Sequence, residues 1–156
     1  MSAFDAAALL GWYERERRPL PWRQTRDPYE LLVSEVMLQQ TQAGRVVPFY
    51  ERFLARFPDA DALAAAPAGD VLAAWSGLGY NRRALALQAA ARHVAARGWP
   101  EDLTELPGVG AYTAAAVGSF AWDRQAAAVD TNVRRVISRH DGAGTRPARW
   151  PAAPPR

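Results

Sequence analysis

The stretch Leu106-Pro-Gly-Val-Gly-Ala-Tyr-Thr-Ala-Ala-Ala-Val117 decides the fold that we expect for this chain. It predicts a short helix that ends in a glycine-rich turn and leads into a second, alanine-rich helix. Gly108 and Gly110 flank Val109, so the turn can adopt backbone conformations that are closed to residues with side chains. Outward N–H groups at the start of the second helix attract an anion, for which a DNA phosphate is the natural candidate. The same letters also suit a plain tight connection between two helices.

Helical patterns dominate the rest of the chain, and strand patterns are nearly absent. Asp27 followed by Pro28 predicts a cap and a first helical residue, with the helix running to Thr41. Further helices are expected over residues 3–17, 44–57, 60–66, 67–75, 81–96 and 101–105. The sequence therefore predicts an all-α fold.

The composition narrows the classes of function. The 156 residues hold 19 basic residues, all of them arginine, against 16 acidic ones. The resulting net charge of +3 suits a nucleic-acid partner without requiring one. The absence of cysteine excludes disulfides, thiol catalysis and cysteine-ligated iron–sulfur clusters from this chain. Only His93 and His140 could offer imidazole ligands, and they are far apart in sequence, so we expect no zinc site.

Glu35 is a candidate general acid. It interrupts a run of apolar residues that surround most of the helix circumference, which is typical of a buried helix. Burial disfavours the charged carboxylate and raises its pKa, and an acid of that kind can donate a proton near neutral pH. An ordinary acid at a helix edge, paired with an arginine, fits the pattern equally well.

Asp130 is a second candidate carboxylate. It directly precedes the segment Thr131-Asn-Val-Arg-Arg-Val-Ile137, where an aspartate serves as a helix N-cap. Capping and catalysis do not exclude each other.

Three segments together resemble the helix-hairpin-helix DNA glycosylases, over roughly residues 10 to 140. They are the glycine-rich turn, Val129-Asp-Thr-Asn-Val-Arg-Arg-Val136 and Ser34-Glu-Val-Met-Leu-Gln-Gln-Thr41. The last looks like the adenine glycosylases of the MutY family, which remove adenine opposite 8-oxoguanine. The resemblance implies a six-helix glycosylase domain with an incomplete second helical subdomain. We expect residues 1–20 to be the N-terminal helix of that subdomain, 21–140 the catalytic domain and 141–156 a disordered tail.

The resemblance also implies roles for individual residues. The family's catalytic acid and its aspartate correspond to Glu35 and Asp130. The residues expected to contact DNA are Gln39, Gln40, Tyr80, Gly108, Val109 and Gly110. The residues expected to form or support the pocket for the extruded base are Arg18, Trp22, Arg23, Leu38 and Asn132. The aromatic and polar members of both sets also suit structural roles, and Arg82 and Arg83 suit either phosphate contacts or a solvated surface.

Tyr112 separates two subclasses. It stands where endonuclease III-like bifunctional enzymes carry a lysine that forms a Schiff base, which a phenol cannot do. We therefore expect a monofunctional glycosylase in which Tyr112 contacts the reacting nucleotide. Simple packing on the alanine-rich helix is the alternative.

Departures from the family pattern qualify the resemblance. Thr131 stands where MutY-like sequences commonly have glycine, and Asn81-Arg82 replaces their usual Tyr-Ala. The family's cysteine-ligated [4Fe–4S] segment and its 8-oxoguanine-recognition domain do not occur in these 156 residues. We thus expect a C-terminally truncated member of the family with reduced stability and no iron–sulfur cluster. Whether a monovalent cation binds at the hairpin stays open at this point.

The leading functional hypothesis is a monofunctional base excision repair glycosylase for adenine mispaired with 8-oxoguanine or guanine. One alternative is a glycosylase for thymine opposite guanine, and another is a catalytically impaired DNA-binding remnant. The expected partner is double-stranded DNA with a mismatched or oxidised base pair, bound by a monomer. With no leader pattern and no run of 18 apolar residues, we expect a cytoplasmic, nucleoid-associated protein and no membrane partner.

Overall fold

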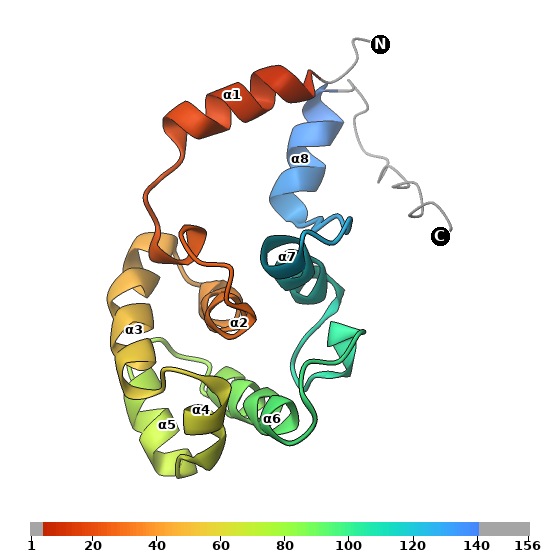
Figure 1. Cartoon of the computed structure of the whole chain (residues 1–156). Helices are drawn as coiled ribbons and strands as arrows, with labels where there is room; N and C mark the ends of the chain where they lie inside the picture. Colours follow the sequence, from red (N-terminus) through yellow and green to blue (C-terminus); the bar gives the residue numbers. More distant parts are fainter. Residues whose placement is uncertain (1–4, 141–156) are drawn as a thin grey trace. The chain divides into compact units, whose positions relative to one another are not determined.

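The computed structural model describes residues 5–140, and these residues contain helices and no strand (Figure 1). The predicted all-α class is confirmed. The α-helices are α1 (Ala6–Glu16), α2 (Pro28–Leu38), α3 (Ala43–Arg56), α4 (Ala60–Ala65), α5 (Ala68–Trp75), α6 (Arg82–Arg97), α7 (Ala111–Trp122) and α8 (Thr131–His140). Two short 3₁₀ helices, η1 (Pro21–Arg23) and η2 (Leu103–Glu105), complete the described part. The predicted disordered tail, residues 141–156, lies outside it.

Contacts between α-carbons divide the described chain into two compact units. One unit is continuous and runs from Pro21 to Ala128. The other combines the described residues up to Leu20 with those from Val129 onward. The domain functions that the sequence predicts stay predictions. Within residues 5–140, no helix has both the length and the apolar character that a membrane crossing requires.

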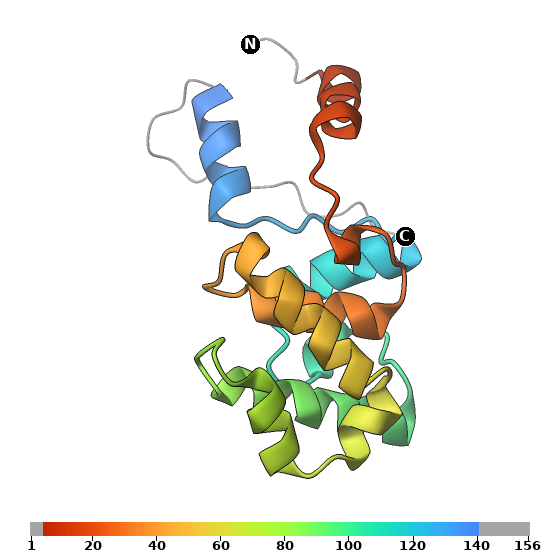
Figure 2. The ribbon, with the colours of Figure 1, turned by 90° about the vertical axis from the view of Figure 1, so that its left-hand side faces the viewer.

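Helix α2 is the centre of the continuous unit. It packs against η1, α3, α6 and α7. Figure 1 shows α2 between α3 and α7, and Figure 2 shows α3 in front of it. The side chain of Asp27 caps its start by accepting the N–H groups of Tyr29 and Glu30, at 2.7 and 3.2 Å. The predicted cap is therefore present. Because neighbouring elements cover most of its circumference, the helix buries nearly all of its apolar side chains.

Helices α3 to α6 form the second part of this core. Phe53 of α3 meets Trp75 of α5 edge-to-face, with ring centroids 5.8 Å apart, and both side chains are fully buried. Gln88 of α6 is also buried and donates its amide N–H groups to the carbonyls of Leu63 and Ala66 at the end of α4. Gln88 thus gives the Ala66 carbonyl a partner at the end of the short helix, and it adds a second donor to the Leu63 carbonyl, which also accepts the N–H of Ala66.

Two elements next to the candidate site differ from the sequence prediction in length or type. Helix α2 ends at Leu38, three residues before the predicted Thr41, because Gln39 leaves the helical conformation and Gln40 has a φ of 59°. The first arm of the glycine-rich hairpin, for which the sequence predicts a helix over 101–105, is the 3₁₀ turn η2. The carboxylate of Asp102 caps the N-terminal end of that turn.

The described parts of the second unit are two amphipathic helices. The side chain of Asp5 caps α1 by accepting the N–H of Ala8 at 2.9 Å. Leu9, Leu10 and Trp12 of α1 are exposed, as are Val133 and Val136 of α8. The helix predicted for this segment therefore forms, but its large apolar side chains are not buried.

Candidate functional site

Glu35 lies on the most buried helix of the continuous unit. The neighbouring side chains Ser34, Val36 and Met37 are buried, whereas Glu35 itself is half-buried. The hydroxyl of Ser34 donates to the carbonyl of Leu31 at 2.8 Å, so the one other polar residue in this stretch is satisfied within the helix. Helix α2 therefore holds the Glu35 carboxyl on a rigid, well-packed backbone at the border between the core and solvent.

The glutamine pair that follows forms a turn at the end of α2. Gln39 is half-buried, and Gln40 is exposed with its backbone in the left-handed region. Thr41 supports the turn through its N–H, which donates to the carbonyl of Leu38 at 3.2 Å. A glutamine seldom adopts a positive φ without support from its surroundings. The turn presents the Gln40 side chain to solvent.

A second turn, Gly77–Tyr80, joins α5 to α6. Gly77 and Gly79 have φ values of 97° and 77°, and Tyr80 follows with a φ of 51°. The Trp75 indole N–H donates to the Gly79 carbonyl at 3.1 Å, and Arg45 of α3 donates to the Gly77 carbonyl at 2.6 Å. Tyr80 is 68% exposed. Hydrogen bonds from Trp75 and Arg45 thus hold the backbone of the turn, while the Tyr80 side chain is exposed.

Arg83 corrects one expectation from the sequence. The sequence pattern predicts that the Arg83 guanidinium faces a phosphate or solvent. In the structure the guanidinium points inward and donates to the carbonyls of Val36, Met37, Gln39 and Gly79. Desolvation by burial lowers the pKa of Arg83 below its ordinary value. Arg82, its neighbour, is exposed. Sequence reasoning missed the role of Arg83 because its partners on α2 lie more than 40 positions earlier in the chain.

The hairpin turn needs its first glycine far more than its second. Gly108 has a φ of 74°, and an added Cβ would lie 2.7 Å from the Cβ of Ala86 in α6. Gly110, by contrast, is extended with a φ of −89° and has open space around it. The turn therefore adopts a conformation closed to residues with side chains, as the sequence predicts, and it does so at Gly108 and not at Gly110. Val109 between them is buried, and its N–H closes the turn by donating to the carbonyl of Leu106 at 3.1 Å.

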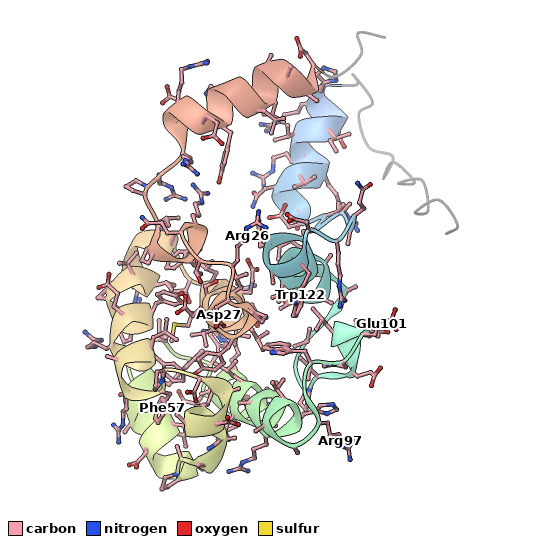
Figure 3. All side chains as sticks on the ribbon, viewed as in Figure 1. Arg26, Asp27, Phe57, Arg97, Glu101 and Trp122 are labelled. Carbon is pink, nitrogen blue, oxygen red and sulfur yellow. The ribbon has the colours of Figure 1, made fainter. Side chains whose placement is uncertain are left out.

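Tyr112 lies in the first turn of α7, directly after the hairpin, and its side chain is 42% exposed. At the other end of α7, Asp123 adopts the left-handed conformation and accepts a hydrogen bond from Arg26 at 2.7 Å. Figure 3 labels Arg26 and Trp122, the last residue of α7. Arg124 donates to the carbonyl of Glu101 at 2.6 Å. The C-terminal end of α7 is therefore connected to two neighbouring segments, and Tyr112 lies at the opposite end of the helix.

The predicted pocket residues of the continuous unit differ in exposure. Trp22 of η1 is buried and meets the ring of Tyr50 edge-to-face, with the centroids 5.3 Å apart. Leu38, the last residue of α2, is half-buried, and Arg23 is exposed. The tryptophan therefore has a packing role, and the pocket role of all three residues stays a prediction.

Asp130, Asn132 and Arg18 belong to the other unit. The Asp130 carboxylate accepts the N–H of Val133 at 2.7 Å, which is the predicted cap of α8, and the Asn132 side-chain amide at 2.9 Å. The Val133 hydrogen bond, helped by that of Asn132, lowers the pKa of Asp130 against the opposing effect of partial burial. Asp130 is thus held as a carboxylate at neutral pH. Arg18 is exposed, beyond the end of α1.

The side chains that could ligate a metal ion form no cluster in the part of the chain that the structure describes. Within residues 5–140, no three His, Cys, Asp or Glu side chains come together in a way that could hold a metal ion. The sequence has no cysteine, so these 156 residues supply no thiolate ligand to an iron–sulfur cluster. The residues present do not fit such a cluster.

Comparisons with known proteins give a consistent result. Residues 33–150 match the family described as HhH-GPD superfamily base excision DNA repair protein. The chain is 49% identical over 139 residues to the adenine DNA glycosylase of Mycobacterium tuberculosis (strain CDC 1551 / Oshkosh), covering 84% of this chain and 45% of that protein. It is 47% identical over 148 residues to the adenine DNA glycosylase of Mycolicibacterium smegmatis, covering 90% and 50%. The chain thus spans about half the length of the curated relatives it matches.

Solved structures resemble the fold as well. A thermostable thymine-DNA glycosylase superposes with a TM-score of 0.78 at 35% identity, covering 85% of this chain and 64% of that one. A non-covalent endonuclease III–DNA complex gives a TM-score of 0.71 at 26% identity, covering 83% and 63%.

Proposed function

This chain belongs to the HhH-GPD superfamily of base excision DNA repair proteins, and we propose that it acts as a DNA N-glycosylase on adenine mispaired with 8-oxoguanine or guanine. The names of the two mycobacterial relatives support adenine as the base. The observation that carries the chemistry is the contrast between two carboxyl groups. Glu35 is half-buried on an apolar helix, whereas Asp130 is a helix cap that is held ionised. Two carboxyl groups in such different environments suit the roles of acid and anion.

The proposed reaction breaks the bond between C1′ of the sugar and the adenine base. The bonding electrons leave with adenine, and the carboxyl proton of Glu35 neutralises the charge that develops on it. The sugar is left electron-poor, and the Asp130 carboxylate stabilises it electrostatically or covalently, as paired carboxylates do in glycoside hydrolysis. Water then supplies the new hydroxyl on C1′ and gives up a proton, which restores the acid.

We infer that the enzyme is monofunctional. Tyr112 occupies the position after the hairpin where a Schiff-base lysine would stand, and a phenol cannot form that adduct. The sequence contains no lysine at all, because its 19 basic residues are all arginine. Base release without strand cleavage is the expected outcome.

DNA binding follows from the same proposal. An endonuclease III of similar fold is known in complex with DNA. Since the target atom lies inside the duplex, the nucleotide must leave the base stack to reach Glu35. Gln40 and Tyr80 have exposed side chains and lie on turns whose backbones are held by hydrogen bonds. These side chains are suited to occupying the space that the nucleotide leaves in the duplex. The backbone N–H groups at the start of α7, directly after the Gly108 turn, are suited to a backbone phosphate, and a monomer suffices for these contacts.

A second candidate is removal of thymine opposite guanine. The thymine-DNA glycosylase that superposes on this chain at 35% identity favours it. Single-turnover base release from duplexes with A opposite 8-oxoguanine, A opposite G and T opposite G tests both candidates. We expect release of adenine and little release of thymine. Release of thymine alone would replace the leading proposal, and binding without any release would indicate a non-catalytic DNA-binding module.

Glu35→Gln is the decisive variant. Glutamine keeps the size of the side chain but has no proton of carboxylic acidity, so base release should fall by on the order of a hundredfold or more. Duplex binding, measured by fluorescence anisotropy, should stay within about twofold, since the variant leaves the shape of the site unchanged. Unchanged base release would remove Glu35 from the mechanism.

A further inference from the structure

Two turns on neighbouring elements carry non-glycine residues in the left-handed region. Gln40 has a φ of 59° at the end of α2, and Tyr80 has a φ of 51° at the start of α6. For residues with a Cβ, this conformation is unfavourable by about 1 to 2 kcal/mol. It persists only where the surroundings over-determine it. Both turns therefore need an external support.

One guanidinium supports both turns. Nη1 of Arg83 donates to the carbonyl of Gln39, which directly precedes Gln40, and to the carbonyl of Val36 at 2.9 Å. Nη2 of Arg83 donates to the carbonyl of Gly79, which directly precedes Tyr80, at 3.3 Å. The last carbonyls of a helix lack internal partners, and a cation there is favoured by the helix dipole. The planar fork of arginine joins the two backbones, which the point charge of a lysine ammonium does less well.

The Arg83 guanidinium also lies against two aromatic rings. It lies 5.7 Å from the centroid of the Trp75 ring and 5.3 Å from that of Tyr80. The Trp75 indole donates to the same Gly79 carbonyl that Arg83 binds. The Tyr80 ring thus has one face toward the guanidinium while most of its surface remains exposed. All of these contacts lie within the unit that runs from Pro21 to Ala128.

We propose that Arg83 is a positioning residue that locks the Gln40 turn and the Tyr80 turn into one rigid wedge for the DNA duplex. This inference rests on the proposed function. Extruding a nucleotide requires free energy to unstack and unpair it. A wedge that is ordered before it meets DNA loses less conformational freedom on binding than two independent turns do. Arg83 therefore acts through Gln40 and Tyr80 and not on the reacting atoms.

The test uses the full chain in a Glu35→Gln background, which keeps the base attached. A duplex with adenine opposite 8-oxoguanine carries 2-aminopurine next to that adenine, and its fluorescence rises when the adenine leaves the stack. We expect Arg83→Lys to lower the equilibrium for extrusion by on the order of tenfold, because lysine keeps the charge but cannot span both turns. Affinity for an undamaged duplex should stay within about twofold.

The matched control is Arg97→Lys, at the opposite end of the same helix, which makes the same chemical change away from both turns (Figure 3). It should extrude adenine like the Glu35→Gln parent. Equal extrusion by the Arg83→Lys and Arg97→Lys proteins would overturn the inference. A parallel loss of affinity for undamaged duplex would also overturn it, because it would identify Arg83 as a phosphate contact. If the chain with Glu35 intact releases no base and the Glu35→Gln parent does not extrude it, the proposed function fails instead.

A second measurement does not depend on the folding of any Arg83 variant. Gln40→Ala and Tyr80→Ala change exposed side chains, singly and together, in a chain that retains Arg83. If the two turns act as one wedge, the combined loss of extrusion should be smaller than the product of the two single losses. Losses that multiply would show that the turns act independently and would overturn the inference.

Discussion

The backbone of Gly108 lies directly against Ala86, so that a Cβ at position 108 would meet the Cβ of Ala86 at 2.7 Å. The contact joins the hairpin to α6, and the positive φ of Gly108 closes the turn. Gly110, two residues later, has neither constraint. The two glycines of one motif therefore differ in what they do for the fold.

Gly108→Ala should destabilise the chain strongly. The added methyl group combines a left-handed conformation with overpacking against Ala86, which together are worth about 2 to 5 kcal/mol. Gly110→Ala adds the same methyl group in open space at the start of α7 and should cost about 1 kcal/mol or less. Urea unfolding of both variants gives the comparison. Equal losses would mean that the contact with Ala86 does not constrain the turn.

Asp130 combines a structural and a chemical role that two substitutions separate. Asparagine caps a helix as well as aspartate, so Asp130→Asn should keep α8 formed and still reduce base release by on the order of a hundredfold. Asp130→Ala should also lose the cap, worth about 1 kcal/mol. Single-turnover kinetics and far-ultraviolet circular dichroism measure the two effects. Normal base release by the Asn variant would mean that Asp130 only caps α8 and has no role in the reaction.

The cap on α8 should respond to acid. The hydrogen bond from Val133 lowers the pKa of Asp130 in the folded chain, so its contribution to stability is present above the unfolded value of about 3.9 and is lost as the pH falls through the lower, folded value. The ¹³C shift of the carboxyl carbon, followed from pH 6 downward, reports this titration directly. A midpoint at or above about 4 would contradict the expected direction.

Because the sequence contains no lysine, a lysine introduced at Tyr112 would be the only lysine amine in these 156 residues. Tyr112→Lys should allow a Schiff base between the new amine and C1′ of the abasic sugar, which borohydride reduces to a stable protein–DNA adduct. The parent chain is the control, because its 19 basic residues are all arginine. Denaturing electrophoresis detects the adduct. No adduct above the parent level would mean that residue 112 does not face the reacting sugar.

The sequence by itself is sufficient where a signal acts over a few residues. Asp27 and Pro28 predict the start of α2, and Asp130 predicts the cap of α8, because a capping side chain reaches only the next two or three N–H groups. The apolar run around Glu35 predicts a buried helix for the same local reason. The candidate acid and the rigid helix that carries it are therefore determined by residues close to them in the chain.

Only the tertiary structure decided which long-range partners meet. Arg83 gave no signal in the sequence, because an arginine that binds backbone carbonyls looks the same there as a solvated one. The carbonyls of Val36 and Gln39, which it binds, lie in or directly after α2, more than 40 positions earlier. Gly108 and Gly110 also look equivalent in the sequence, and the contact with Ala86 distinguishes them. Every residue has a backbone carbonyl and many have methyl groups, so the sequence does not show which of them a distant side chain or turn will contact. Those contacts are determined by how the helices pack. Local chemistry determined the helices and their caps, and packing determined which turns and side chains they bring together.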